Sequence, residues 1–76
     1  LEDEPAPNHI LTPRQMEVIQ AVADGKSNKQ MAYELGLSEG TVKLHVTAIL
    51  KLLNVNNRTG AVREAERLGV IRHEKY

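Results

Sequence analysis

The stretch SNKQMAYELGLSEGTVKLHVT, residues 27–47, predicts two helices joined by a tight turn. A serine can cap the start of each helix, Ser27 for the first and Ser38 for the second, and Gln30 completes a capping box with Ser27. Gly36 ends the first helix, because glycine readily adopts the left-handed backbone of a helix exit. The sequence therefore predicts a helix-turn-helix unit.

Small and apolar residues within this unit have the spacing that two packed helices require. Ala32 lies where the helices approach each other, so a larger side chain there would hold them apart. The turn glycine follows four residues later, and Val42 returns to the shared core six residues after that glycine. The predicted apolar seam consists of Met31, Ala32, Leu35, Leu37 and Val42.

One further helix is predicted on each side of the unit. Before it, Thr12 and Gln15 form a capping box around a proline, and Gly25 ends the helix. After it, Asn57 begins a helix that Gly69 ends. The apolar stripe of the first helix consists of Met16, Ile19, Val22 and Ala23, with Val18 at its edge. Four helices with short connections and no β-type alternation predict an all-α, tetrahelical domain.

The helix predicted over residues 39–53, with Asn54 as its exit, has two different faces. Its inward face, within about 40° of Val42 on a helical wheel, consists of Val42, Val46, Ile49 and Leu53. Its outer half consists of Lys43, Leu44, Thr47, Ala48 and Lys51, and His45 lies at the edge of the core. Lysine can donate to guanine O6 and N7, and leucine and threonine methyl groups can contact thymine methyls. This face therefore fits the major groove of duplex DNA.

The predicted helix starts are candidate seats for phosphate, since helix N-termini present unpaired N–H groups and partial positive charge. Lys29, Thr41 and Arg58 are the stronger candidates, and Asn28 lies beside them. Ser27 and Ser38 are expected to act mainly as caps.

Composition excludes several classes of protein. A chain of 76 residues is one small domain, and the absence of cysteine excludes disulfides, thiolate zinc sites and cysteine nucleophiles. The apolar runs are too short for a membrane span or a signal sequence, so we expect neither. No catalytic constellation is present, so we do not expect an enzyme. The three histidines lack the spacing of metal ligands, so we expect no metal and no cofactor.

Charge is distributed unevenly, although the formal net charge is zero. Residues 1–24 hold one base and five acids, and residues 25–76 hold nine bases and five acids. We expect residues 1–10 to be an acidic linker, which contains two prolines. We expect residues 11–71 to form the folded domain and residues 72–76 to form a tail. Because the chain begins with Leu1 rather than methionine, we expect it to be part of a longer protein.

Landmarks in all four predicted helices resemble the LuxR-type (GerE-like) helix-turn-helix domain, over roughly residues 10–71. They are Leu11-Thr12-Pro13-Arg14-Gln15, Glu17-Val18, Gly25, Ser27-Asn28-Lys29, Ala32, Leu35, Leu37-Ser38, Thr41-Val42-Lys43, His45, Ile49, Leu53 and Asn57-Arg58-Thr59. Such domains lie at the C-terminus of NarL-like response regulators and quorum-sensing regulators. Two positions depart from the family pattern, since Leu52 replaces a residue that is often basic and Gly60 one that is often acidic.

The resemblance implies a cytoplasmic, bacterial-type transcription regulator that binds double-stranded DNA through the helix over residues 39–53. Family positions that read bases fall on Lys43, Leu44 and Thr47. Positions that contact phosphate fall on Thr41, His45 and Lys51, with Asn28, Lys29 and Arg58 at the other helix starts.

The resemblance also implies partners. The fourth helix would form a homodimer on inverted half-sites, with Val62, Arg63 and Glu66 outward and Ala61, Ala65 and Leu68 inward. An N-terminal regulatory domain, often a phosphorylatable receiver, and RNA polymerase are the other partners implied.

The alternative is a helical module for protein interaction without sequence-specific DNA binding. In that case Leu44, Leu52 and Val62 would anchor a partner. Binding to duplex DNA at two salt concentrations distinguishes the two functions.

Overall fold

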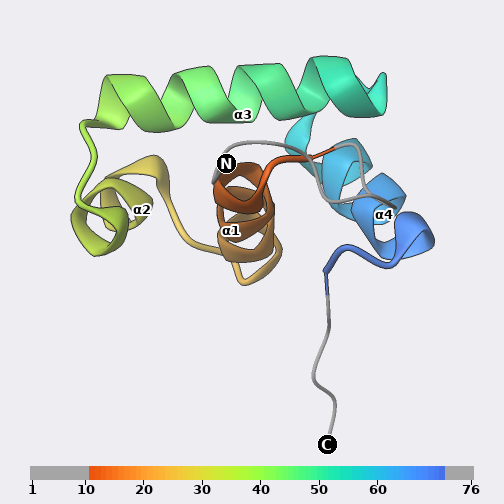
Figure 1. Ribbon diagram of the computed structural model, residues 1–76, viewed down its shortest axis with the longest axis horizontal. Helices are drawn as coiled ribbons and strands as arrows, with labels where there is room; N and C mark the ends of the chain where they lie inside the picture. Colours follow the sequence, from red (N-terminus) through yellow and green to blue (C-terminus); the bar gives the residue numbers. More distant parts are fainter. Residues whose placement is uncertain (1–10, 72–76) are drawn as a thin grey trace, which may run out of the picture.

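The computed structural model describes residues 11–71, which form four helices. These are α1 (Pro13–Ala23), α2 (Asn28–Leu35), α3 (Glu39–Leu53) and α4 (Arg58–Leu68). Figure 1 shows α3 lying along one side of the other three, with α2 near its start, α1 beneath its middle and α4 near its end. The predicted all-α, four-helix class is confirmed. The predicted linker (residues 1–10) and tail (residues 72–76) lie outside the described residues.

Side-chain caps begin all four helices, as the sequence predicts. Thr12 Oγ1 accepts from the backbone N–H of Gln15 at 3.1 Å, while Gln15 Oε1 accepts from the Thr12 N–H at 2.9 Å. Ser27 forms the same reciprocal pair with the residue three positions later. Ser38 Oγ accepts from the third residue of α3 and Asn57 Oδ1 from that of α4. Each cap satisfies an N–H group that has no partner within the helix.

Substituting Ser38 tests how much the start of α3 depends on its cap. Ser38 Oγ accepts from the Thr41 N–H at 3.0 Å, and Ser38→Ala leaves that N–H without a protein partner. We expect Ser38→Ala to lower the free energy of unfolding by about 1 kcal/mol in urea denaturation. Ser38→Asn, which retains a capping oxygen, should stay close to the parent. If the two variants unfold alike, the cap contributes no stability.

The exits from the helices follow from the same local chemistry. Gly36 ends α2 with φ 69° and Asn54 ends α3 with φ 57°, both in the left-handed region. Glycine has no Cβ to clash in this region, and asparagine tolerates it better than most residues. The turn at Gly36 directs the chain from α2 into α3 and so sets the relative positions of the two helices.

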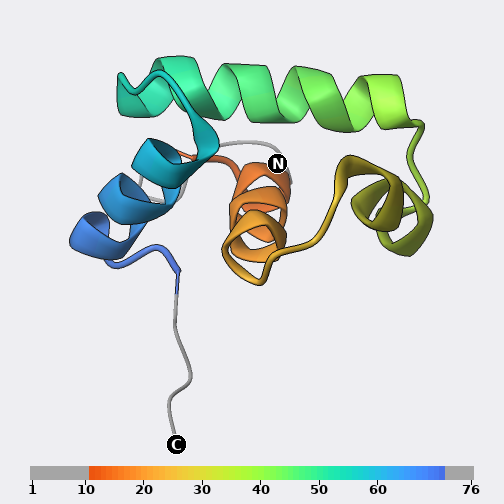
Figure 2. The same ribbon diagram turned by 180° about the vertical axis from the view of Figure 1, so that it is seen from behind.

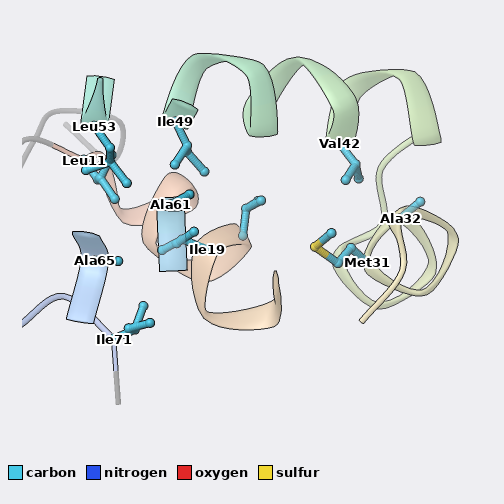
Figure 3. Close-up of a cluster of buried hydrophobic side chains, with 11 residues drawn as sticks. Leu11, Ile19, Met31, Ala32, Val42, Ile49, Leu53, Ala61, Ala65 and Ile71 are labelled. Atoms are coloured by element: carbon cyan, nitrogen blue, oxygen red, sulfur yellow. The ribbon is translucent and has the colours of Figure 1, made fainter. Parts of the chain in front are cut away.

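A single apolar core joins the four helices (Figure 3). Val42 points from α3 toward Met31 of α2, and Ile49 points from the same helix toward Ile19 and Ala61. The buried residues are Leu11, Val18, Ile19, Met31, Ala32, Val42, Ile49, Leu53, Ala61, Ala65 and Ile71. No polar or charged residue among residues 11–71 is buried. The predicted inward face of α3 is confirmed, with Val46 half-buried against this core.

Two predicted orientations are wrong. Val18, predicted at the edge of its stripe, is fully buried, because α1 packs against both α3 and α4 and therefore buries a wider arc than one neighbour would cover. Leu68, predicted to lean inward, is 39% exposed. Beyond Gly69 the chain turns, and Ile71 rather than Leu68 is buried there.

Candidate nucleic-acid interface

The outer face of α3 is not covered by any of the other described helices. In Figures 1 and 2, which view the molecule from opposite sides, α1, α2 and α4 all lie on the same side of α3. Leu44 is 71% exposed, and Lys43, Thr47 and Lys51 are also exposed. The three predicted base-reading residues therefore lie on a projecting surface that a duplex can approach.

The charges on this face are not neutralised within the described part of the chain. The ion pairs among residues 11–71 are Arg14–Glu17, Lys26–Glu34 and Arg67–Glu64. None of them involves Lys43 or Lys51. The only acid of α3 is Glu39 in its first turn, where it faces the positive end of the helix dipole. The outer face thus offers two lysines, a hydroxyl and apolar groups to an anionic partner.

The N-termini of α2 and α4 meet at a hydrogen bond that the sequence does not predict. Arg58 Nη2 donates to Asn28 Oδ1 across 30 positions of sequence, and the pair is partly buried. Arg58 also lines a small apolar space together with Val46 and Leu50. A guanidinium has five N–H donors, so this bond leaves others for a phosphate. The bond therefore positions two of the residues predicted to contact phosphate.

The remaining candidates for phosphate contact have different surroundings. Lys29 is exposed in the first turn of α2. Thr41 is half-buried, and its Oγ1 accepts a hydrogen bond from Ser38 Oγ at 2.9 Å. His45 is half-buried one turn further along α3, in keeping with the core-edge position predicted from the wheel.

The predicted dimer face of α4 is less uniform than the sequence indicates. Arg63 and Glu66 are exposed, but Val62 is half-buried and packs against the core. One turn on, Arg67 donates to Glu64, and this hydrogen bond lowers the pKa of the Glu64 carboxyl and raises that of Arg67. This pair occupies charges that would otherwise be available to a partner.

Two surface features of the fold are not predicted by the sequence. Tyr33, on α2, is 89% exposed, and no spacing rule distinguishes it from a core tyrosine. A groove of about 380 Å³ lies between the end of α1 and the start of α4. Its walls come from segments more than 30 positions apart, so only the tertiary structure shows it. Beside it, a hydrogen bond of 2.5 Å to Glu34 raises the pKa of Lys26.

Residues 11–71 contain no group of three or more histidine, aspartate or glutamate side chains that could hold a metal ion. None of the four described helices is both long enough and apolar enough to cross a membrane.

Comparison with known proteins shows similarity over most of the chain. Residues 9–65 match the model for bacterial regulatory proteins of the luxR family. The chain is 48% identical to the transcriptional regulatory protein DegU of Brevibacillus brevis over 66 residues. This alignment covers 87% of this chain and 28% of DegU. It is 51% identical to the glycerol metabolism activator of Pseudomonas putida over 55 residues, in an alignment that covers 72% of this chain and 25% of that protein. The chain thus spans about a quarter of the length of these two curated relatives.

Solved structures show the same similarity. The transcription factor GerE superposes with a TM-score of 0.79 at 34% identity, over 82% of this chain and 92% of GerE. The response regulator ChrA of a heme-sensing two-component system gives a TM-score of 0.79 at 39% identity, over 87% of this chain and 33% of ChrA. The chain is therefore similar to both proteins in sequence as well as in fold.

Proposed function

Because the chain belongs to the luxR family of bacterial regulatory proteins and is a helix-turn-helix DNA-binding domain of transcription regulators, not an enzyme, we propose that the outer face of α3 reads bases in the major groove. Lys43 donates to guanine O6 and N7, and Leu44 and Thr47 contact thymine methyl groups. The observation that carries this proposal is the exposure of all three side chains on the uncovered side of α3.

Affinity comes from a second set of contacts, to the phosphates that flank the groove. Neutralising phosphates releases condensed counterions, which makes binding strong at low salt and independent of sequence. The residues proposed for this role are Asn28, Lys29, Thr41, His45, Lys51 and Arg58. The bond between Asn28 and Arg58 supports the proposal, because it holds two helix N-termini in one arrangement that a duplex backbone can meet.

We also propose what kind of full-length protein contains this chain. ChrA is a response regulator of a two-component system, and by similarity we assign this chain to a cytoplasmic response regulator with an N-terminal regulatory domain. Two such chains bind inverted half-sites as a homodimer through α4, where Arg63 and Glu66 are exposed and Val62 flanks them. RNA polymerase is the proposed further partner.

Binding to duplex DNA at two salt concentrations tests the function. Three cationic side chains are proposed to contact phosphate, namely Lys29, Lys51 and Arg58, so we expect log K to fall with log salt at a slope of about −2.7 per protomer. Raising the salt fourfold should then weaken binding by about 40-fold. Fluorescence anisotropy with a labelled duplex measures both values. An absence of duplex affinity at low salt would instead support a protein-interaction module.

Selection of bound duplexes from a random pool tests sequence reading and symmetry together. We expect a short half-site, recovered as an inverted repeat if α4 forms the dimer. Recovery of single half-sites would keep base reading by α3 and remove the proposed dimer.

A further inference from the structure

We infer that the groove between α1 and α4 is the docking site of the chain's own acidic segment, residues 1–10. The groove is lined by Val22, Gly25, Lys26, Arg58, Thr59, Val62 and Arg63. Three of these residues are cations and none is an acid. The segment LEDEPAPNHI holds three consecutive acids, Glu2, Asp3 and Glu4.

The cations of the groove are only partly compensated by neighbouring groups. Lys26 pairs with Glu34 at 2.5 Å, and Asp24 also attracts it. Arg58 is bonded to the neutral amide of Asn28, and no ion pair among the described residues involves Arg58 or Arg63. Two guanidinium groups therefore face the groove without a carboxylate partner among residues 11–71. Guanidinium groups bind carboxylates through paired N–H donors.

The floor of the groove is apolar and matches the rest of the segment. Val22 and Val62 are half-buried and pack against the core beneath the groove. The segment places Leu1 next to the acids on one side and Pro5-Ala6-Pro7 on the other. Apolar groups beside carboxylates suit a groove with an apolar floor and a cationic rim. Two prolines also limit the conformational entropy that docking would cost.

The segment is long enough to reach the groove. Leu11 precedes α1 and Gly25 follows it, and the eleven residues of α1 between them span about 16 Å. The seven residue-to-residue steps from Glu4 to Leu11 span up to about 25 Å when the chain is extended. The acids can therefore reach the far end of α1, where the groove lies.

Docking has a consequence that rests on the proposed function. Arg58 is both a wall of the groove and a proposed phosphate contact, so the docked carboxylates compete with DNA for it. The acidic segment then lowers DNA affinity until a duplex or another event displaces it.

Paramagnetic relaxation tests the docking directly on the full chain. The chain has no cysteine, so Ala6→Cys provides one site for a nitroxide label. We expect amide signals of Gly25, Thr59 and Val62 to lose more than half their intensity and to regain it at high salt, because exposed ion pairs are screened. Broadening centred on α3, or spread evenly over the domain, would overturn the proposal. A second sample mixes a spin-labelled chain without isotope enrichment and an isotope-enriched chain without the spin label. Broadening of the enriched chain's signals in this mixture would show docking between two copies and would also overturn the proposal.

Matched variants identify the groove as the partner of the segment. In the labelled chain, Arg63→Gln should reduce the broadening by half or more, while Arg67→Gln, one turn further along the same helix, should leave it unchanged. Equal effects of the two variants would mean that general charge, not the groove, attracts the segment. Replacing the three acids by Glu2→Gln, Asp3→Asn and Glu4→Gln should abolish the broadening and raise DNA affinity about two- to fivefold.

The two proposals fail separately. A chain that shows the broadening but does not bind duplex DNA keeps the docking and loses the function. A chain that binds DNA with no broadening at the groove keeps the function and loses the docking.

Discussion

The Ile49→Ala variant is expected to lose about 2–5 kcal/mol in the free energy of unfolding. Ile49 is 1% exposed, and Figure 3 shows it pointing from α3 toward Ile19 of α1 and Ala61 of α4. Its removal leaves a cavity where three helices meet, and the short α1 and α4 can close only part of it. A domain of 76 residues is typically stable by about 4–11 kcal/mol, so the loss is a large share of the total.

Leu44→Ala is the matched control for this prediction. The two residues lie on the same helix, five positions apart, but Leu44 is 71% exposed. Its truncation should change stability by less than about 0.5 kcal/mol, as surface substitutions usually do. Urea denaturation followed by circular dichroism at 222 nm compares both variants with the parent. Similar losses for Leu44→Ala and Ile49→Ala would contradict the assignment of the two faces of α3.

The two faces of α3 could be predicted from the sequence because one helix wheel contains all the information they require. A fixed angle per residue separates Val42, Ile49 and Leu53 from Lys43 and Leu44, and packing against a single side preserves that separation. Caps and exits were predictable for the same reason, since each depends on residues within four positions of one another. The all-α class and the helix-turn-helix unit followed directly.

Features that depend on two distant segments could not be predicted in this way. Val18 was misplaced because its burial requires a second neighbour for α1, which no single wheel includes. Leu11 and Ile71 lie outside the regular helices, where there is no periodicity to indicate burial. Leu68 was misplaced because the turn at Gly69 lets a later residue take the buried position.

The candidate site shows the same division between local and tertiary information. Lys43 and Thr47 were predicted to be exposed from the wheel, and they are. The partnership of Arg58 with Asn28 depends on how α4 packs against the rest, so the sequence could propose both residues for phosphate contact but not their bond. The groove beside Arg58 needs α1 and α4 together and was missed entirely.

Lys43→Ala and Lys51→Ala are expected to weaken DNA binding in different ways, although both remove one exposed lysine from α3. Lys43 is proposed to donate to guanine, so its loss should reduce affinity for the selected site by about 1–3 kcal/mol and relax preference at one base position. Lys51 is proposed to contact phosphate, so its loss should weaken all sequences alike and lower the salt slope by about one unit.

The two lysines are suitable controls for each other because neither is paired within residues 11–71 and both lie outside the core. Their variants should therefore match the parent in stability, so that any difference in binding reflects the missing interaction between the lysine and DNA. Anisotropy titrations on the selected site, on its single-base variants and on an unrelated duplex separate the two effects. If Lys43→Ala lowers affinity equally for all of these duplexes, Lys43 contacts the backbone, and base reading must then rest on Leu44 and Thr47. The outer face of α3 would still meet DNA, but through shape and methyl contacts in place of hydrogen bonds to guanine.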